Sequence, residues 1–281
     1  MKKKLIIIIS AVLIIAIAGG IFAINALNGN KKPDRPVKLL MIGNSFSWNA
    51  FTYIRQIAEA EGVELVVANL YYSGCSLEKH YDFLCMDSSD YYYSCSWAEE
   101  QTGYSLKKAL ADQDWDYISL QQVSGYAGDY ESYQPYLHSL VSYLRENEPG
   151  AEIIWHQTWA YQKTSDHSDF PKYDSSQNKM WKAINSTSKK AAKAENIKYI
   201  VPSGKAFQNA RATAIGDNLN TDGYHANDMG CYLAGYCFFS TVTGVLPSDN
   251  AYKLPNVDEA TMELLKTAVT DAVEEYGCVE W

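Results

Sequence analysis

Short apolar runs alternate with amphipathic segments along most of the chain, a pattern typical of a sheet enclosed by helices. Glycine or polar residues separate each apolar run from the helical pattern that follows it. The expected strands are residues 37–42, 64–70, 116–121, 152–157 and 198–201. Because helices lie between these strands, we predict an α/β domain: a three-layer α/β/α sandwich around a roughly five-stranded parallel sheet.

Apolar residues at helical spacing predict the outer layers of this sandwich. The expected helices are residues 50–61, 106–111, 131–147, 177–195, 204–215, 229–242 and 258–276. One stretch, residues 71–104, fits neither pattern, since it combines turns, many aromatic residues and three cysteines. We interpret it as an insertion near the ligand site.

The amino-terminal segment indicates where the protein acts. Lys2, Lys3 and Lys4 precede an almost unbroken apolar run at residues 5–24, which is long enough to cross a bilayer. Lysines on that side place the amino terminus in the cytoplasm and the domain outside it. We expect residues 1–27 to be a signal peptide or membrane anchor and favour the uncleaved anchor, because Ala23-x-x-Ala26 is a poor cleavage site. Residues 28–36 would be a linker, and 37–281 the single domain.

Composition narrows the function. A formal net charge of -9 without a basic stripe argues against a nucleic-acid partner. The 22 tyrosines and 7 tryptophans fit core edges and loops, with sugar stacking as the alternative. The six cysteines of an exported chain can form disulfides, although free buried thiols are the alternative for at least two of them.

The first expected strand leads into a candidate nucleophile. Residues 37–48 read Val-Lys-Leu-Leu-Met-Ile-Gly-Asn-Ser-Phe-Ser-Trp, a strand followed by a tight turn and a helical pattern. Ser45 then lies at the carboxyl end of a strand and the start of a helix, where open α/β sheets bind ligands. Gly43 permits the turn, and the helix N-terminus favours developing negative charge. We interpret Ser47 as the cap of the helix.

A second group of polar residues lies near the carboxyl end, in Asn-Thr-Asp-Gly-Tyr-His-Ala-Asn-Asp at 220–228. Asp222 precedes His225 by three residues, so its carboxylate can hold one imidazole nitrogen and leave the other to act as a base. Asp228 is an alternative partner that we interpret as a helix cap. The other histidines lack the spacing of a ligand set, so we expect no metal site. These histidines are His80, His138, His156 and His167.

Three motifs occur in the order found in one superfamily. Gly43-Asn44-Ser45-Phe46, Gly74 and Asp222-x-x-His225 resemble the SGNH/GDSL hydrolases, and the Ile-Gly-Asn-Ser-Phe-Ser opening is similar to DUF4886-type proteins. The resemblance covers roughly residues 38–244. It implies an SGNH/flavodoxin-like sandwich and a serine hydrolase that uses no cofactor.

The resemblance also implies roles. Ser45 matches the nucleophile, His225 the base and Asp222 its partner, while the backbone N–H groups of Ser45 and Gly74 would form an oxyanion hole. The superfamily's third donor is an asparagine in a Gly-x-Asn-Asp segment, but this chain reads Ser-Leu-Gln-Gln-Val-Ser-Gly at 119–125. Gln122 is the first candidate for that donor and Gln121 the second.

We expect side chains at the same sheet edge to contact the substrate: Asn44, Gln121, Gln157 and Trp159. For Trp159 the alternative is packing over the sheet. The expected function is an extracytoplasmic serine esterase that removes an acetyl or other short acyl group from a glycan or a small ester. The alternatives are a non-catalytic carbohydrate-binding surface protein on the same fold and a lipase-like or lysophospholipase-like esterase.

Overall fold

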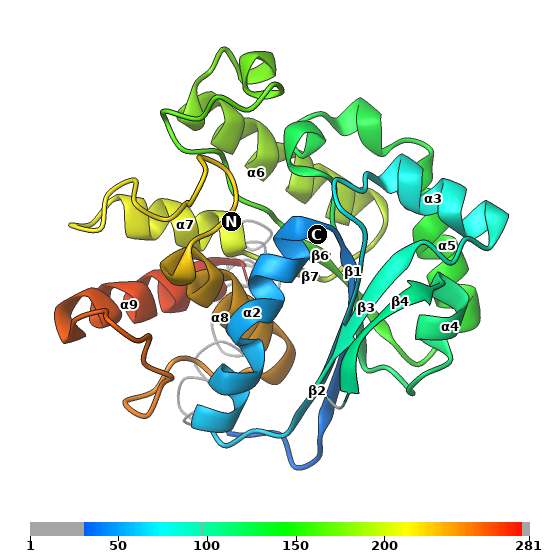
Figure 1. Ribbon diagram of the computed structural model, residues 1–281, viewed down its shortest axis with the longest axis horizontal. Coiled ribbons are helices and arrows are strands. Elements are labelled where there is room, and N and C mark those ends of the chain that lie inside the picture. Colours follow the sequence, from blue (N-terminus) through cyan, green and yellow to red (C-terminus); the bar gives the residue numbers. More distant parts are fainter. Residues whose placement is uncertain (1–30, 97, 277–281) are drawn as a thin grey trace, which may run out of the picture. The chain divides into compact units, whose positions relative to one another are not determined.

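The structure is a computed structural model of the 281-residue chain, and it describes residues 31–96 and 98–276. A compact unit begins at Pro33 (Figure 1). The apolar run at residues 5–24 lies outside the described residues. In the ranges that are described, no helix has the length and apolar character needed to cross a membrane.

A seven-stranded sheet forms the centre of this unit, in the order β4-β3-β2-β1-β5-β6-β7. The pairs β1–β2, β1–β5, β5–β6 and β6–β7 are parallel, so the α/β sandwich with five parallel strands is confirmed. The strands are β1 Val37–Gly43, β2 Leu65–Tyr71, β3 Tyr91–Cys95, β4 Ala98–Tyr104, β5 Tyr117–Leu120, β6 Glu152–His156 and β7 Tyr199–Val201.

The stretch 71–104 is more regular than the sequence pattern indicates. It contains a helix, α3, and an antiparallel hairpin, β3–β4, that extends the sheet beyond β2. Every described residue of β4 before Tyr104 is exposed and all but Ala98 and Gly103 are polar, so the strand lacks the apolar alternation by which strands are predicted. A polar, exposed strand also protects the sheet edge from pairing with other chains.

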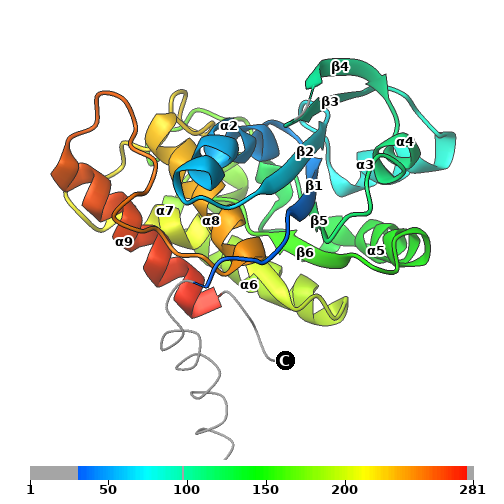
Figure 2. The same cartoon turned by 90° about the horizontal axis from the view of Figure 1, so that it is seen from below.

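Helices cover both faces of the sheet (Figure 2). They are α2 Ser45–Ala60, α3 Leu77–Met86, α4 Leu106–Leu110, α5 Tyr136–Asn147, α6 Gln177–Ala194, α7 Ser203–Arg211, α8 Asp228–Thr243 and α9 Glu259–Tyr276. One face carries α2, α7, α8 and α9, and the other carries α3, α4 and α5. All seven predicted helices occur. α5 begins later than expected because a short 3-10 helix, Tyr130–Tyr133, and Pro135 precede it.

Two apolar cores result, one on each side of the sheet. Along β1, Leu39 and Met41 join the core beneath α2, while Leu40 and Ile42 join the core beneath α5. Burial on both sides explains the unbroken apolar run of this strand. Cys278 lies outside the described residues. The five described cysteines are free thiols: Cys75, Cys85, Cys95, Cys231 and Cys237.

Two buried histidines belong to these cores and remain neutral. His80 contacts the Tyr91 hydroxyl through Nδ1 at 2.7 Å, and His156 contacts the side chains of Gln121 and Ser203. Burial lowers the pKa of each imidazole from 6.5 to about 3. In the unfolded chain both would take up a proton near pH 6.5, whereas in the folded protein they do not.

We therefore expect stability to fall in mild acid. Because the folded-state pKa is lowered, the free energy of unfolding is at its full value above pH 6.5 and falls progressively down to about pH 3. Each histidine lowers it by about 1.4 kcal/mol per pH unit in this range. Urea titrations should show a free energy of unfolding about 2 kcal/mol lower per histidine at pH 5 than at pH 7.5. The variant His80→Gln should show about half of this pH dependence; an unchanged slope would contradict the assignment.

Candidate active site

Ser45 is placed by a tight turn at the end of β1. Gly43 ends the strand, and a Cβ atom there would lie 2.8 Å from the Ser47 side chain and 2.9 Å from that of Gln121, so the turn needs glycine. Asn44 caps α2 by accepting the Phe46 N–H at 3.0 Å. Ser45 is thus the first residue of α2, at the positive end of its dipole.

The structure brings Ser45, Asp222 and His225 together although 180 residues separate the serine from the histidine. Nε2 of His225 lies 2.9 Å from Oγ of Ser45, and Nδ1 lies 2.6 Å from Oδ2 of Asp222. The second carboxylate oxygen of Asp222 accepts the backbone N–H groups of Tyr224 and His225 at 3.2 and 2.8 Å. The side chains of His225 and Asp222 are 32% and 42% exposed, so this site opens to solvent.

Asp222 remains a carboxylate in this arrangement. Partial burial raises its pKa, but the hydrogen bonds from His225 and from two backbone N–H groups outweigh burial and hold the pKa below its usual value. A charged acceptor fixes the proton of neutral His225 on Nδ1. Nε2 is then the acceptor for the Ser45 hydroxyl, as general-base catalysis requires.

Gly74 lies in an exposed turn after β2, with φ +63. Asn44 joins this turn to the serine turn, because its Nδ2 donates to the carbonyl of Cys75 at 3.0 Å. Neither the N–H of Ser45 nor that of Gly74 has a hydrogen-bond partner among the described residues. Two free backbone donors therefore lie on turns that a direct hydrogen bond connects.

Gln122 is not available as the third oxyanion donor. Its side chain is 1% exposed, and its Nε2 donates to the carbonyl and hydroxyl oxygens of Ser132. Its Oε1 accepts the backbone N–H groups of Leu77 and Val123 at 3.0 and 2.8 Å. The amide joins α3 to the loop after β5, and this structural use replaces the expected one.

Asn44 and Gln121 form a buried network instead of contacting substrate. Both are 1% exposed, and Nε2 of Gln121 donates to Oδ1 of Asn44 at 2.9 Å. Oε1 of Gln121 lies 2.8 Å from Nδ1 of His156, whose Nε2 lies 3.0 Å from the Ser203 hydroxyl. Gln121 is thus not placed to donate to an oxyanion or to contact substrate, because it is 1% exposed and its amide is bonded to Asn44 and His156.

Gln157 and Trp159 are also fully buried. Trp159 is stacked between Phe46 and Phe207, with ring centroids 4.2 and 4.5 Å away, and its Nε1 donates to the carbonyl of Tyr224 at 2.8 Å. It therefore supports the segment that carries His225, as in the packing alternative. Gln157 donates to Asn185 of α6 at 3.2 Å.

The observed helix caps precede the expected ones by three residues in α2 and by one residue in α8. Asn44 caps α2, while Ser47 lies within the helix and donates to the Asn44 carbonyl at 2.8 Å. Asn227 caps α8 by accepting the Gly230 N–H, and Asp228 instead accepts the Tyr53 hydroxyl. In both cases an asparagine precedes the residue that the sequence suggests, and a short amide is an equally good cap.

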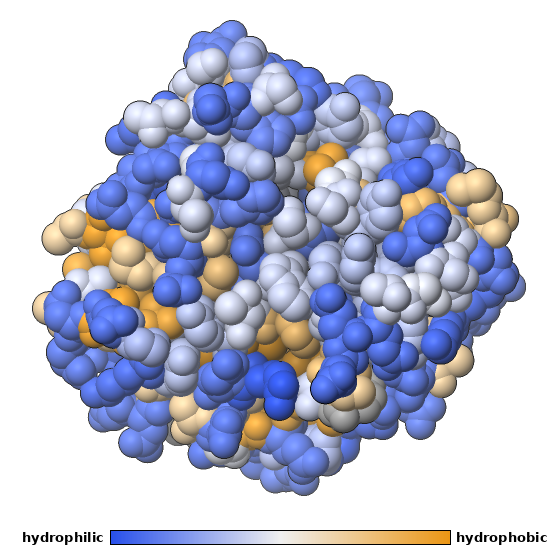
Figure 3. Space-filling view, viewed as in Figure 1, coloured by the Kyte–Doolittle hydropathy of each residue, from blue (hydrophilic) through white to orange (hydrophobic). Residues whose placement is uncertain are grey.

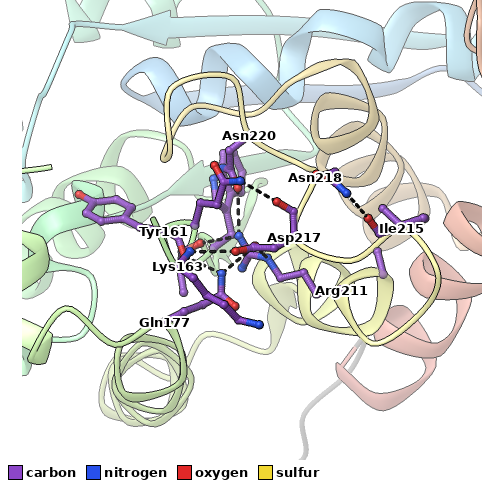
Figure 4. Close-up of polar contacts among 12 residues, drawn as sticks. Tyr161, Lys163, Gln177, Arg211, Ile215, Asp217, Asn218 and Asn220 are labelled. Carbon is purple, nitrogen blue, oxygen red and sulfur yellow. Dashed lines mark hydrogen bonds and ion pairs between the residues drawn. The ribbon is translucent and has the colours of Figure 1, made fainter. Parts of the chain in front are cut away.

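Sequence reasoning missed a buried ion pair beneath the loop at residues 216–228, which carries His225 and which we call the histidine loop (Figure 4). Arg211 at the end of α7 is 5% exposed and lies 2.8 Å from Asp217, and burial lowers its pKa to about 10. Asp217 also accepts Gln177 Nε2 and the Lys163 N–H, each at 2.8 Å. Arg211 donates further to Oδ1 of Asn220 at 3.0 Å.

Asn220 carries this support to the histidine. Its Nδ2 donates to the Tyr224 carbonyl at 3.0 Å, the same oxygen that Trp159 contacts. A second link comes from Asn49 on α2, whose Oδ1 accepts the N–H of Ala226 at 3.1 Å. The residues on both sides of His225 are therefore held by buried Trp159 after β6 and by two half-buried asparagines, Asn49 of α2 and Asn220, which Arg211 of α7 supports.

No set of three or more histidine, cysteine, aspartate or glutamate side chains that could hold a metal occurs within the described ranges.

Among known families, a model described as "Domain of unknown function (DUF4886)" matches residues 38–272. The chain belongs to the DUF4886 family. No curated protein matches it.

Solved structures agree with this membership. A DUF4886 family protein from Bacteroides uniformis is 38% identical, with a TM-score of 0.83 over 85% of this chain and 95% of that one. A candidate GDSL-like lipase from Parabacteroides merdae is 16% identical (TM-score 0.50), and an alpha/beta hydrolase enzyme from the Lake Arreo metagenome is 12% identical (TM-score 0.51). Each covers 73% of this chain and 94% of its own. The two distant matches show a shared fold, and the expected DUF4886 membership is confirmed by the family model.

The ion pair beneath the histidine loop gives a stability prediction for this DUF4886 protein. Asp217→Asn would leave the Arg211 guanidinium buried without a counter-charge, and we expect a loss of about 3 kcal/mol in urea unfolding. Hydrogen exchange of the loop at residues 216–228 should also accelerate. The matched control is Asp174→Asn, which removes an exposed ion pair with Lys179 and should change stability by less than about 0.5 kcal/mol. Equal effects of both variants would contradict the supporting role.

Proposed function

We propose that this DUF4886 protein is a serine ester hydrolase. The observation that carries the proposal is the continuous hydrogen-bonded chain from Ser45 through His225 to Asp222, with heavy-atom distances of 2.9 and 2.6 Å. A nucleophile, a base within hydrogen-bond reach and a carboxylate that orients the base together constitute the arrangement used in acyl transfer. The membership in a family whose fold is shared with GDSL-type proteins is consistent with it.

In the proposed reaction, Nε2 of His225 takes the proton of Ser45 while Oγ attacks the carbonyl carbon of the ester. The Asp222 carboxylate stabilises the imidazolium. The free N–H groups of Ser45 and Gly74 donate to the oxyanion, and a single such donor contributes about 3 kcal/mol to the transition state. The imidazolium then protonates the leaving alcohol, and a water activated by His225 cleaves the acyl-enzyme, restoring Ser45.

The substrate that we propose is a short-chain acyl ester, with an acetylated glycan as the natural form. The half-exposed active site supports a large substrate, because the alcohol part of that substrate can extend over the surface.

We also propose that the protein acts outside the cytoplasm. This part rests on Lys2–Lys4 and the apolar run at residues 5–24. We expect mass spectrometry of the exported protein to find this run retained; an amino terminus near Asn28 would indicate a cleaved signal peptide.

The first test is hydrolysis of p-nitrophenyl acetate and butyrate by the full-length protein. Ser45→Ala and His225→Ala should each lower kcat at least about 1000-fold, because the nucleophile and its base act as one unit. Asp222→Asn should lower kcat at least about 100-fold, since the imidazole would lose its orienting charge.

The matched control for these variants is Ser47→Ala. Ser47 lies two residues from the nucleophile, is 1% exposed and donates its hydroxyl to the Asn44 carbonyl. We expect kcat to remain within about twofold while the free energy of unfolding falls by about 1 kcal/mol. Equal rates for wild-type protein and Ser45→Ala, with unchanged circular dichroism, would refute the proposed nucleophile.

A further inference from the structure

Three aromatic rings form a continuous surface beside Ser45, and we call Trp48, Tyr71 and Tyr92 the aromatic platform. The ring centroids of Trp48 and Tyr71 are 5.1 Å apart, and those of Tyr71 and Tyr92 are 5.4 Å apart with planes inclined by 26°. Trp48 and Tyr92 are 38% and 40% exposed. Of the four large apolar side chains exposed in the described ranges, this platform contains two.

The backbone places the platform in line with the nucleophile. Gly43, two residues before Ser45, pairs with Tyr71 across β1 and β2, and Tyr71 pairs with Tyr92 across β2 and β3. Paired residues point to the same side of a sheet, here the side that α2 covers. Trp48 lies one helical turn after Ser45 on α2. The platform therefore extends about two strand spacings, or about 10 Å, away from the serine turn.

The chemistry around the rings is that of a neutral polar ligand. Glu100 on β4 accepts the Tyr71 hydroxyl at 2.9 Å and the Ser94 hydroxyl at 2.6 Å. Among the residues described, its carboxylate is the one charged group hydrogen-bonded to the platform, and it would repel phosphate or an anionic lipid. In Figure 3 the surface over the start of α2 and the neighbouring strand ends is pale, the colour of intermediate hydropathy, as tyrosine and tryptophan give.

We infer that the aromatic platform binds the sugar rings of a neutral oligosaccharide whose ester group is presented to Ser45. Pyranose rings have flat faces of C–H groups that stack on aromatic rings, while their hydroxyl groups bond to acceptors at the edge such as Glu100. An acyl chain of a lipid needs an enclosed apolar site, whereas these rings lie open. This inference rests on the proposed hydrolase function, because it assigns the alcohol part of that substrate.

The test separates sugar binding from catalysis by using full-length Ser45→Ala protein and unacylated ligands. The probes are neutral β-1,4-linked hexasaccharides of xylose, glucose, mannose and N-acetylglucosamine, titrated by calorimetry. We expect at least one to bind, and Tyr92→Ala in the same background to raise its Kd about tenfold. Tyr92→Phe retains the ring and should bind as the parent does. Tyr143→Ala, which removes a half-buried ring from α5 on the opposite face of the sheet, should also leave Kd unchanged.

A parallel assay keeps the two proposals distinguishable. Hydrolysis of p-nitrophenyl acetate by wild-type protein and by Ser45→Ala tests the esterase alone, since this ester carries no sugar. Binding of none of the four sugars, or equal Kd values with and without the Tyr92 ring, would overturn the platform even if hydrolysis depended on Ser45. Sugar binding that needs Tyr92, in a protein whose hydrolysis does not depend on Ser45, would retain the sugar site and remove the esterase.

Discussion

The buried side chain of Asn44 connects the three segments on which the position of Ser45 depends. Its Oδ1 accepts from Phe46 at the start of α2 and from Gln121 after β5, while its Nδ2 donates to Cys75 after β2. A buried amide left without one of these partners would cost about 1 to 3 kcal/mol. Asn44 therefore holds the carboxyl ends of β1, β2 and β5 in one arrangement. The positions of the serine hydroxyl and of the Gly74 N–H depend on that arrangement.

The histidine has no comparable support from the sheet, because it belongs to a loop. Its position depends on the Tyr224 carbonyl, which accepts from both Trp159 and Asn220, and on the ion pair of Arg211 and Asp217 beneath them. Ion pairs of this kind contribute little net stability, since desolvation offsets attraction, but removing one partner is costly. Such a pair therefore restricts the loop to one conformation without adding much to the stability of the protein.

Periodicity predicted the parallel strands and the seven helices because burial determines both, as the doubly buried β1 illustrates. The spacing Asp222-x-x-His225 predicted the contact of these two side chains, because that contact is local in the sequence. Gln122 was expected as an oxyanion donor because it lies where the superfamily has an asparagine, and Gln157 at the substrate because it ends a strand at the same sheet edge. Their partners Ser132 and Asn185 lie 10 and 28 residues away in the sequence. In the sequence, a glutamine that is buried and hydrogen-bonded cannot be told from an exposed one unless its partners are known. The same holds for a buried ion pair and two solvated charges.

The hairpin that the sequence pattern hides also accounts for the one surface feature that no motif suggested. Tyr71 ends β2, and its hydroxyl is bonded to Glu100 on β4, two strands away, across the Tyr92 ring of β3. That bond fixes the Tyr71 ring, whose plane is inclined by 26° to that of Tyr92. β4 supplies this carboxylate and is exposed at its other described positions before Tyr104, so it lacks the apolar alternation of an ordinary strand. The polarity that conceals β4 in the sequence thus includes the group that bonds to Tyr71.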